Sequence, residues 1–164
     1  MKGNQVNSTN PATFATDLGE AHKEENKLKE WFEGKYDCVA TTTQDKGSFP
    51  GYDLSVHFNE TNEDVTIEVK MDKKVATTGN IAVEFQRTLK NGTVKPTCIN
   101  ATTADVWVYI FHGRYHFIET VSLKQMIQDK LYTRIVNGAG DGDRASCYLF
   151  PVDVFKSYCD IVKP

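Results

Sequence analysis

The chain has 164 residues, a formal net charge of −3 at pH 7, and a composition that is 40% hydrophobic and 25% charged. These values are typical of one globular domain with a substantial core, and the net charge excludes a strongly basic nucleic-acid-binding protein. No run approaches the roughly 18 apolar residues that a membrane span needs. We therefore expect a single domain over residues 17–164, preceded by a flexible arm over residues 1–16 that is rich in Asn, Ser and Thr.

The cysteines give no sign of a zinc site or of a disulfide framework. None of the four has CxxC spacing, and the N-terminus has no apolar segment of the kind that a signal peptide needs. We therefore expect reduced, mostly buried thiols in a cytoplasmic protein. The Asn-x-Ser/Thr sequences are expected to be chance matches for the same reason.

Apolar spacing predicts the elements of the first half of the chain. A helical stripe indicates a first helix over residues 17–33, which Gly34 would end. Alternating patterns then predict strands over residues 36–42, 52–58 and 65–71, with a polar turn joining the last two. Residues 80–86 alternate in the same way.

In the second half, the pattern predicts more strands and two short helices. Residues 106–111 are nearly all apolar, which is typical of a strand buried on both faces, and a turn leads from it into a strand over 115–120. Ser122 would cap a helix that ends near residue 130. A Gly- and Asp-rich loop over 137–144, a strand over 147–150 and a helix over 152–162 complete an α/β fold with a central mixed sheet flanked by helices.

Two carboxylates and a lysine are expected on one face of the hairpin formed by strands 52–58 and 65–71. Side chains alternate along a strand, so Glu68 and Lys70 share a face. Matching the apolar faces of both strands places Asp53 on that face as well. Carboxylate oxygens suit Mg²⁺ or Mn²⁺, and a lysine beside them suits chemistry on phosphate. A solvated, ion-paired strand face is the alternative, because acid-x-lysine spacing is common by chance.

Pro50-Gly51-Tyr52-Asp53 and Glu68-Val69-Lys70 resemble the signature of the PD-(D/E)xK nuclease superfamily, whose fold is restriction-endonuclease-like. Residues 78–85 and 103–109 are similar to a phage-associated branch of these nucleases. The resemblance covers residues 17–111. It departs from the usual signature in that two residues separate Pro50 from Asp53.

The resemblance implies a Mg²⁺- or Mn²⁺-dependent nuclease that hydrolyses phosphodiester bonds in duplex or branched DNA, as an endonuclease and often as a homodimer, in a bacterium or a phage-infected cell. It implies that Asp53 and Glu68 hold the metal, with the Val69 carbonyl as a further ligand, and that Lys70 positions the attacking water. In several families of this fold, Holliday-junction resolvases among them, an acid of the first helix joins the site. Glu25 matches that acid best, ahead of Glu24 and Glu20.

Further candidates lie on the next strand and beside it. Glu84 and Gln86 would extend the same polar face if strand 80–86 joins the sheet, as a third metal ligand and a DNA contact. Lys73, Lys74 and Arg87 flank the site in sequence and are candidates for phosphate contacts. Solvated surface residues are the alternative for each of them.

Other functional classes stay open. The chain could be a non-catalytic nucleic-acid- or protein-binding module of the same fold, or a small metabolic or carbohydrate-binding α/β protein whose acids lie on the surface. The intact set of two acids and a lysine argues against a decayed site. His57 is expected to be exposed or structural rather than catalytic, and Trp107 is expected in the core. The loop over 138–143 lacks the P-loop lysine and the terminal EF-hand Glu.

Overall fold

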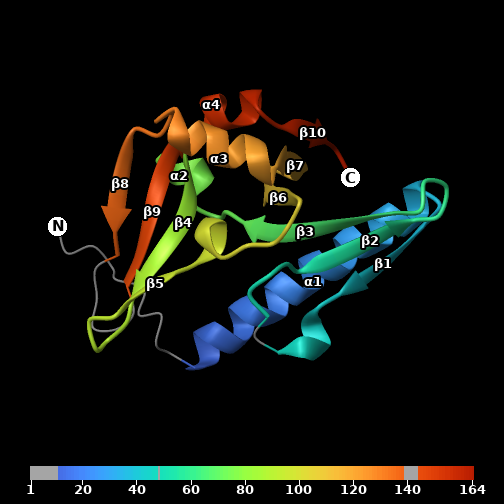
Figure 1. The fold of residues 1–164 in the computed structure, drawn as a ribbon, viewed down its shortest axis with the longest axis horizontal. Helices are drawn as coiled ribbons and strands as arrows, with labels where there is room; N and C mark the ends of the chain where they lie inside the picture. Colours follow the sequence, from blue (N-terminus) through green and yellow to red (C-terminus); the bar gives the residue numbers. More distant parts are fainter. Residues whose placement is uncertain (1–10, 48, 139–143) are drawn as a thin grey trace.

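The computed structural model describes residues 11–47, 49–138 and 144–164. Its strands form two sheets, and helices cover them (Figure 1). One sheet has six strands in the order β1-β2-β3-β6-β7-β10, and the other has four in the order β5-β4-β9-β8. The expected α/β class, with a mixed sheet flanked by helices, is confirmed. Residues 1–10 of the arm expected over residues 1–16, and most of the loop over 137–144, fall outside the described residues.

The elements follow one another along the chain with these bounds: α1 (Pro11–Lys35), β1 (Cys38–Thr42), η1 (Gln44–Lys46), β2 (Leu54–Phe58), β3 (Glu63–Met71), α2 (Val75–Thr78), β4 (Asn80–Thr88), β5 (Val94–Pro96), η2 (Cys98–Asn100), β6 (Val106–Phe111), β7 (Arg114–Glu119), α3 (Thr120–Gln128), β8 (Arg134–Asn137), β9 (Arg144–Pro151), α4 (Val152–Ser157) and β10 (Asp160–Val162).

Helix α1 begins at Pro11, earlier than the expected residue 17, so residues 11–16 belong to the helix rather than to the arm. Proline suits the first turn of a helix, where its missing N–H removes no hydrogen bond. Leu28 and Phe32 of α1 are buried against the six-stranded sheet. The Glu33 carboxylate accepts a hydrogen bond from the backbone N–H of Ala40 at 3.0 Å, which ties the end of α1 to β1.

Strands β1, β2 and β3 form an antiparallel meander, β6 runs parallel to β3, and β7 and β10 continue antiparallel. Leu54 pairs with Ile67 and Ser55 pairs with Thr66. The hairpin register that was predicted from the apolar faces is therefore confirmed. Across the parallel pair, Glu68 lies opposite Trp107 and Lys70 lies opposite Tyr109.

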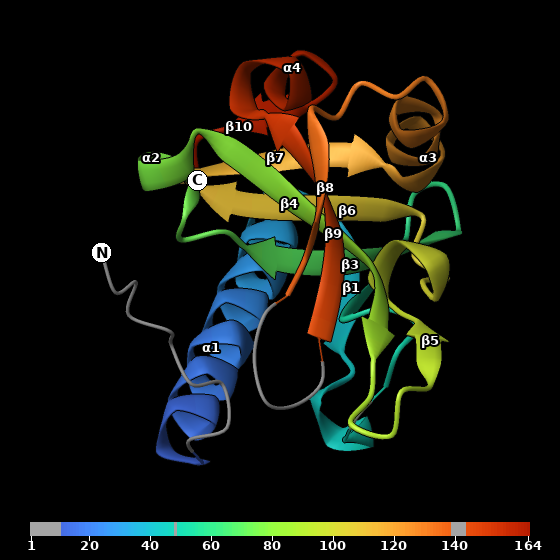
Figure 2. The same cartoon turned by 90° about the vertical axis from the view of Figure 1, so that its left-hand side faces the viewer.

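The six-stranded sheet has a hydrophobic core on each face. On one face, α1 packs over the meander and over β6 and β7. On the other face, a second core forms between this sheet, the four-stranded sheet and helices α3 and α4. In Figure 2, α4 lies at the top and α3 at the upper right. The side chains of Leu54 and Ile67 face α1, and successive side chains of a strand point to opposite faces. Glu68 and Lys70 lie one and three residues after Ile67, so they face away from α1.

Strand β4 does not join the six-stranded sheet, so the expectation that it extends the polar face of β3 was wrong. It pairs with β9 and β5 in the second sheet. The short helix α2 and the left-handed Gly79 (φ 67°) turn the chain away from β3 before β4 begins. Local alternation identifies a strand, but the choice of sheet depends on pairing with β9, far along the chain.

The chain end also differs from the prediction. Helix α4 stops at Ser157, and the last residues form the edge strand β10, which pairs with β7. Strands β5 and β8 were not predicted, because each is short and mostly exposed. Helix α3 begins at Thr120 rather than Ser122, and the Thr120 hydroxyl donates to the Ala104 carbonyl at 2.6 Å.

In the described part of the chain, no helix combines the length and the apolar character needed to cross a membrane. The four cysteines, all of which are described, are free thiols of intermediate exposure rather than fully buried ones.

Candidate active site

Asp53 lies directly before β2 and is held at both its backbone and its side chain. Its carboxylate Oδ2 accepts a hydrogen bond from the backbone N–H of Val69 at 2.8 Å. Its carbonyl accepts a hydrogen bond from the N–H of Thr43 at 3.0 Å, and the Thr43 hydroxyl donates to the Tyr52 carbonyl, also at 3.0 Å. The position of this carboxylate is therefore set by β3 and by the segment that follows β1.

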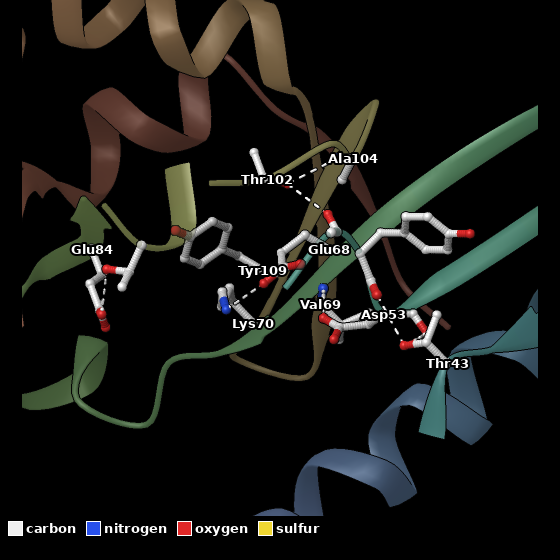
Figure 3. A network of polar contacts seen from close by, with 12 residues as sticks. Thr43, Asp53, Glu68, Val69, Lys70, Glu84, Thr102, Ala104 and Tyr109 are labelled. Carbon is white, nitrogen blue, oxygen red and sulfur yellow. Dashed lines mark hydrogen bonds and ion pairs between the residues drawn. The ribbon is translucent and has the colours of Figure 1, made fainter. Parts of the chain in front are cut away.

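Glu68 and Lys70 point to the same face of β3 and contact each other. Lys70 Nζ lies 2.6 Å from Glu68 Oε1, and the Glu68 side chain is only 11% exposed. Lys70 Nζ also lies 5.6 Å from the centre of the Trp107 ring. Figure 3 shows Asp53, Glu68 and Lys70 in succession along this hairpin, as the sequence predicted.

Glu25 reaches the same site from α1. It is buried, and its Oε2 accepts a hydrogen bond from Gln44 Nε2 at 2.8 Å. Gln44 Nε2 also lies within hydrogen-bonding distance of the His22 carbonyl, at 3.1 Å. Electrostatic interactions link Glu25 to Asp53 and to Lys70. Glu25 is thus near enough to interact electrostatically with Asp53 and Lys70, while its hydrogen bond is to Gln44.

The site concentrates negative charge in a partly buried place. Burial raises the pKa of each of Glu25, Asp53 and Glu68, and the charge of Asp53 adds to this effect on both glutamates. Burial alone would lower the pKa of Lys70, but Glu68, Cys98 and Asp53 together outweigh it and the pKa is raised, so Lys70 stays charged. One lysine therefore lies among three carboxyl groups.

This donor set fits a hard divalent cation such as Mg²⁺ or Mn²⁺, because it consists of carboxylate oxygens and carries surplus negative charge. Among the residues that the structure describes, no three acidic, His or Cys side chains are already gathered closely enough to hold an ion. Glu68 contacts Lys70, and Glu25 contacts Gln44. Binding an ion would require these carboxylates to exchange such partners for the metal.

Lys73 and Lys74 lie at the end of β3, beside a surface pocket of about 390 Å³. Lys70 also lines this pocket, together with Asp17 of α1 and Ala82 of β4. Lys73 forms an ion pair with Glu20 of α1, which connects the two sides of the pocket. Lys73 and Lys74, two of the candidates for phosphate contacts, thus share a pocket with Lys70.

Glu84, Gln86 and Arg87 belong to the four-stranded sheet. The Glu84 carboxylate accepts hydrogen bonds from Arg87 at 3.1 Å and from the Thr97 hydroxyl at 2.8 Å. In Figure 3, Glu84 lies beyond Lys70, on the side away from Asp53. Gln86 lies between Pro96 and Ser146 in its sheet. These residues do not extend the polar face of β3 as the sequence suggested.

Several residues near the site gave no signal in the sequence. His22 interacts electrostatically with Asp53, and Cys98 interacts with Lys70.

Trp107 is fully buried, as expected, but its indole N–H has no hydrogen-bond partner among the described residues. By contrast, His57 lies further along β2 and contacts Asp64 at 2.9 Å, so it does not reach the site.

Comparison of the chain with protein-family models, with curated proteins and with solved structures found no match.

Proposed function

We propose that this chain is a metal-dependent nuclease of the PD-(D/E)xK superfamily, with a restriction-endonuclease-like fold, that hydrolyses phosphodiester bonds in DNA as an endonuclease. The observation that carries the proposal is the convergence of Asp53, Glu68 and Lys70 on one face of the hairpin. The approach of Glu25 from α1 supports it, because the resemblance implied an acid from this helix.

The residues that would hold Mg²⁺ or Mn²⁺ are Asp53, Glu68 and Glu25, with the Val69 carbonyl as a further oxygen ligand. A bound divalent ion would supply Lewis acidity toward a phosphate oxygen and lower the pKa of a bound water. The raised pKa of each carboxyl group favours association with a cation over isolated charge.

Lys70 would orient the attacking water and offset negative charge that develops on the phosphate. Its ammonium lies 5.6 Å from the centre of the Trp107 ring, and a metal that took Glu68 as a ligand would release the ammonium from its ion pair for this role. Lys73 and Lys74 would contact phosphates on either side of the bond that is cut, through the pocket beside Lys70. In this mechanism the lysines act on phosphate and the carboxylates act on the metal.

Cleavage assays test the proposal directly. Wild-type protein is incubated with single-stranded, duplex and branched DNA in the presence of Mg²⁺ or Mn²⁺, beside Lys70→Ala and Glu68→Gln. Loss of one catalytic group typically costs a factor of about 100 to 1,000 in rate. Lys124→Ala, which removes an exposed lysine of α3, is the matched control and should cleave like the wild type. Equal cleavage rates for wild type and Lys70→Ala would identify a contaminating nuclease, and the proposed nuclease function would then be wrong.

A non-catalytic nucleic-acid-binding module is the second candidate. The observation that favours it is that Glu68 and Asp53 already have protein partners, Lys70 and the Val69 N–H. Calorimetry with Mn²⁺ separates the two. If the protein is a nuclease, Mn²⁺ binding should give a measurable heat. The Glu68→Ala variant should show no such heat, whereas Glu84→Gln, in the other sheet, should show the same heat as the wild type. DNA binding without metal binding or cleavage would favour the module.

A further inference from the structure

The segment that leads into Asp53 brings together the exposed ring of Phe49, the ring of Tyr52, which is half-buried against the core, and the ammonium group of Lys46. Phe49 is 36% exposed, and its ring meets the Tyr52 ring edge to face, with the ring centres 5.1 Å apart. Lys46 Nζ lies 4.8 Å from the centre of the Phe49 ring and 5.8 Å from that of Tyr52. These three side chains are called the aromatic platform below. They carry no part of the metal chemistry described above.

The platform is anchored to the same structure that fixes Asp53. The Gly51 carbonyl accepts hydrogen bonds from the N–H of Thr103 at 3.0 Å and from the Thr102 hydroxyl at 3.2 Å. Gly51 is buried, and a side chain there would meet the Phe49 ring at 3.0 Å. Tyr52 directly precedes Asp53, and its carbonyl accepts the Thr43 hydroxyl bond. The platform and the carboxylate are therefore placed by one anchored segment.

We propose that Lys46, Phe49 and Tyr52 form a binding site for an unpaired nucleobase and its phosphate, so that the substrate of this site is single-stranded or locally unpaired DNA. The inference rests on the proposed nuclease function. An aromatic side chain gains stacking energy only from a base whose face is free, and neighbouring bases cover both faces inside a duplex. Because the platform adjoins Asp53, the stacked base belongs to a nucleotide next to the phosphate that is cut.

The charge of Lys46 supports a nucleotide rather than a neutral aromatic ligand. Its ammonium lies over one face of the Phe49 ring and over the Tyr52 ring, which leaves the other face of Phe49 for a base, and a phosphate attached to that base would neutralise the ammonium. The protein as a whole carries a net charge of −3, so bulk attraction to DNA does not explain binding. Local stacking and a few lysine contacts must supply the affinity.

Binding measured without metal tests this inference separately from cleavage. Fluorescence anisotropy is recorded with EDTA for a labelled oligothymidine and for a blunt duplex of equal length. We expect the wild type to prefer the single strand, and Phe49→Ala to weaken single-strand binding by about 5- to 150-fold while duplex binding is unchanged. Tyr158→Ala, which removes an exposed aromatic ring after α4, should change neither.

Two further variants distinguish stacking from simple apolar contact or charge. Phe49→Leu keeps an apolar side chain without a ring and should lose the single-strand preference, whereas Phe49→Trp should keep it. Lys46→Gln should lower the salt dependence of binding by about one released counterion. Wild-type affinity in Phe49→Leu, or equal wild-type affinity for both DNAs, would overturn the inference.

The outcome is distinguishable from failure of the nuclease proposal. If the protein binds single strands through Phe49 but never cleaves, the proposed base-binding site is supported and the proposed nuclease activity is wrong. If it cleaves duplex DNA at the same rate with and without Phe49, the nuclease activity is supported and the base-binding site is wrong.

Discussion

The Asp53 carboxylate accepts a hydrogen bond from the backbone N–H of Val69 at 2.8 Å, so a side chain just before β2 pairs with the backbone of β3. Val69 stands between Glu68 and Lys70. One carboxyl group therefore both closes the hairpin at this point and lies beside the charged pair on β3. Structural and functional contributions of Asp53 can be separated by substitution.

Asp53→Asn should fold as stably as the wild type or more stably, since it keeps an acceptor oxygen and removes a charge whose pKa burial raises. Asp53→Ala should lose about 1–3 kcal/mol of unfolding free energy, because the Val69 N–H is left without its partner. Urea denaturation of the three proteins measures the difference. Equal stability of Asn and Ala variants would mean that the hydrogen bond contributes nothing. Both variants should lose Mn²⁺ binding.

Lys70→Met should make stability more sensitive to rising pH. The pKa of Glu68 is already raised by burial, and Lys70 is the main group that lowers it. Without Lys70, the folded protein holds the Glu68 proton to higher pH than the unfolded chain does. Stability therefore falls as pH rises above the ordinary value of 4.5. Unfolding free energies from about pH 5 to about pH 8 should diverge from those of Lys124→Met, the exposed control. Parallel curves would show that Lys70 does not offset the Glu68 charge.

The placement of Asp53, Glu68 and Lys70 could be predicted because it depends on a strict period of two. Leu54 and Ile67 are fully buried, so only one register of the hairpin hides the apolar faces. Glu25 was predictable in part, since its distance from Leu28 and Phe32 places it at the margin of the buried stripe of α1. In both cases, short-range periodicity determines the geometry.

The rest of the site depends on contacts between distant parts of the chain. Gln44 reaches Glu25 from a 3-10 turn that has no periodic pattern. Glu84 alternates like a residue of the first sheet, but its strand pairs with β9, where it faces Cys147. The pairing of β10 with β7 was missed for the same reason, because three residues at an edge carry little pattern. Such choices are decided by which long-range pairing buries more surface.

His116 should make the protein less stable at acidic pH. Burial lowers its pKa, although Nδ1 lies 3.1 Å from the Tyr109 carbonyl, and the ring stacks on Phe111 with centres 3.7 Å apart. The unfolded chain binds a proton near the ordinary value of 6.5 while the folded protein does not, so stability falls as pH drops below that value.

Removal of the imidazole tests this directly. His116→Phe keeps the stack and should flatten this part of the pH dependence. The exposed His112→Asn removes only the smallest of the causes that affect the pKa of His116 and should retain most of the wild-type slope. Thermal denaturation at a series of pH values provides the comparison. The buried carboxyl groups of Asp53 and Glu68 act in the opposite direction, since their raised pKa favours the folded state as pH falls. An unchanged slope in His116→Phe would assign the pH dependence to other groups.

Gly51 links the fold to the site through a close approach. A Cβ atom at this position would lie 2.8 Å from Thr103 Oγ1 and 3.0 Å from the Phe49 ring. Threonine is stiff about its first side-chain torsion, so relief of the conflict by rotation of Thr103 costs energy. Gly51→Ala should therefore cost about 1–3 kcal/mol of stability, as overpacking does elsewhere.

The displacement should also reach Asp53, two residues further on, and weaken Mn²⁺ binding. Thr103→Ala removes the nearer of the conflicting atoms, so the double variant Gly51→Ala, Thr103→Ala should recover part of both losses. Urea denaturation and calorimetry of the two single variants and the double variant form a complete cycle, in which a coupling of at least about 0.5 kcal/mol is expected for residues in contact. Strictly additive losses would mean that the cost of Gly51→Ala does not come from the contact with Thr103 but from the backbone conformation at residue 51.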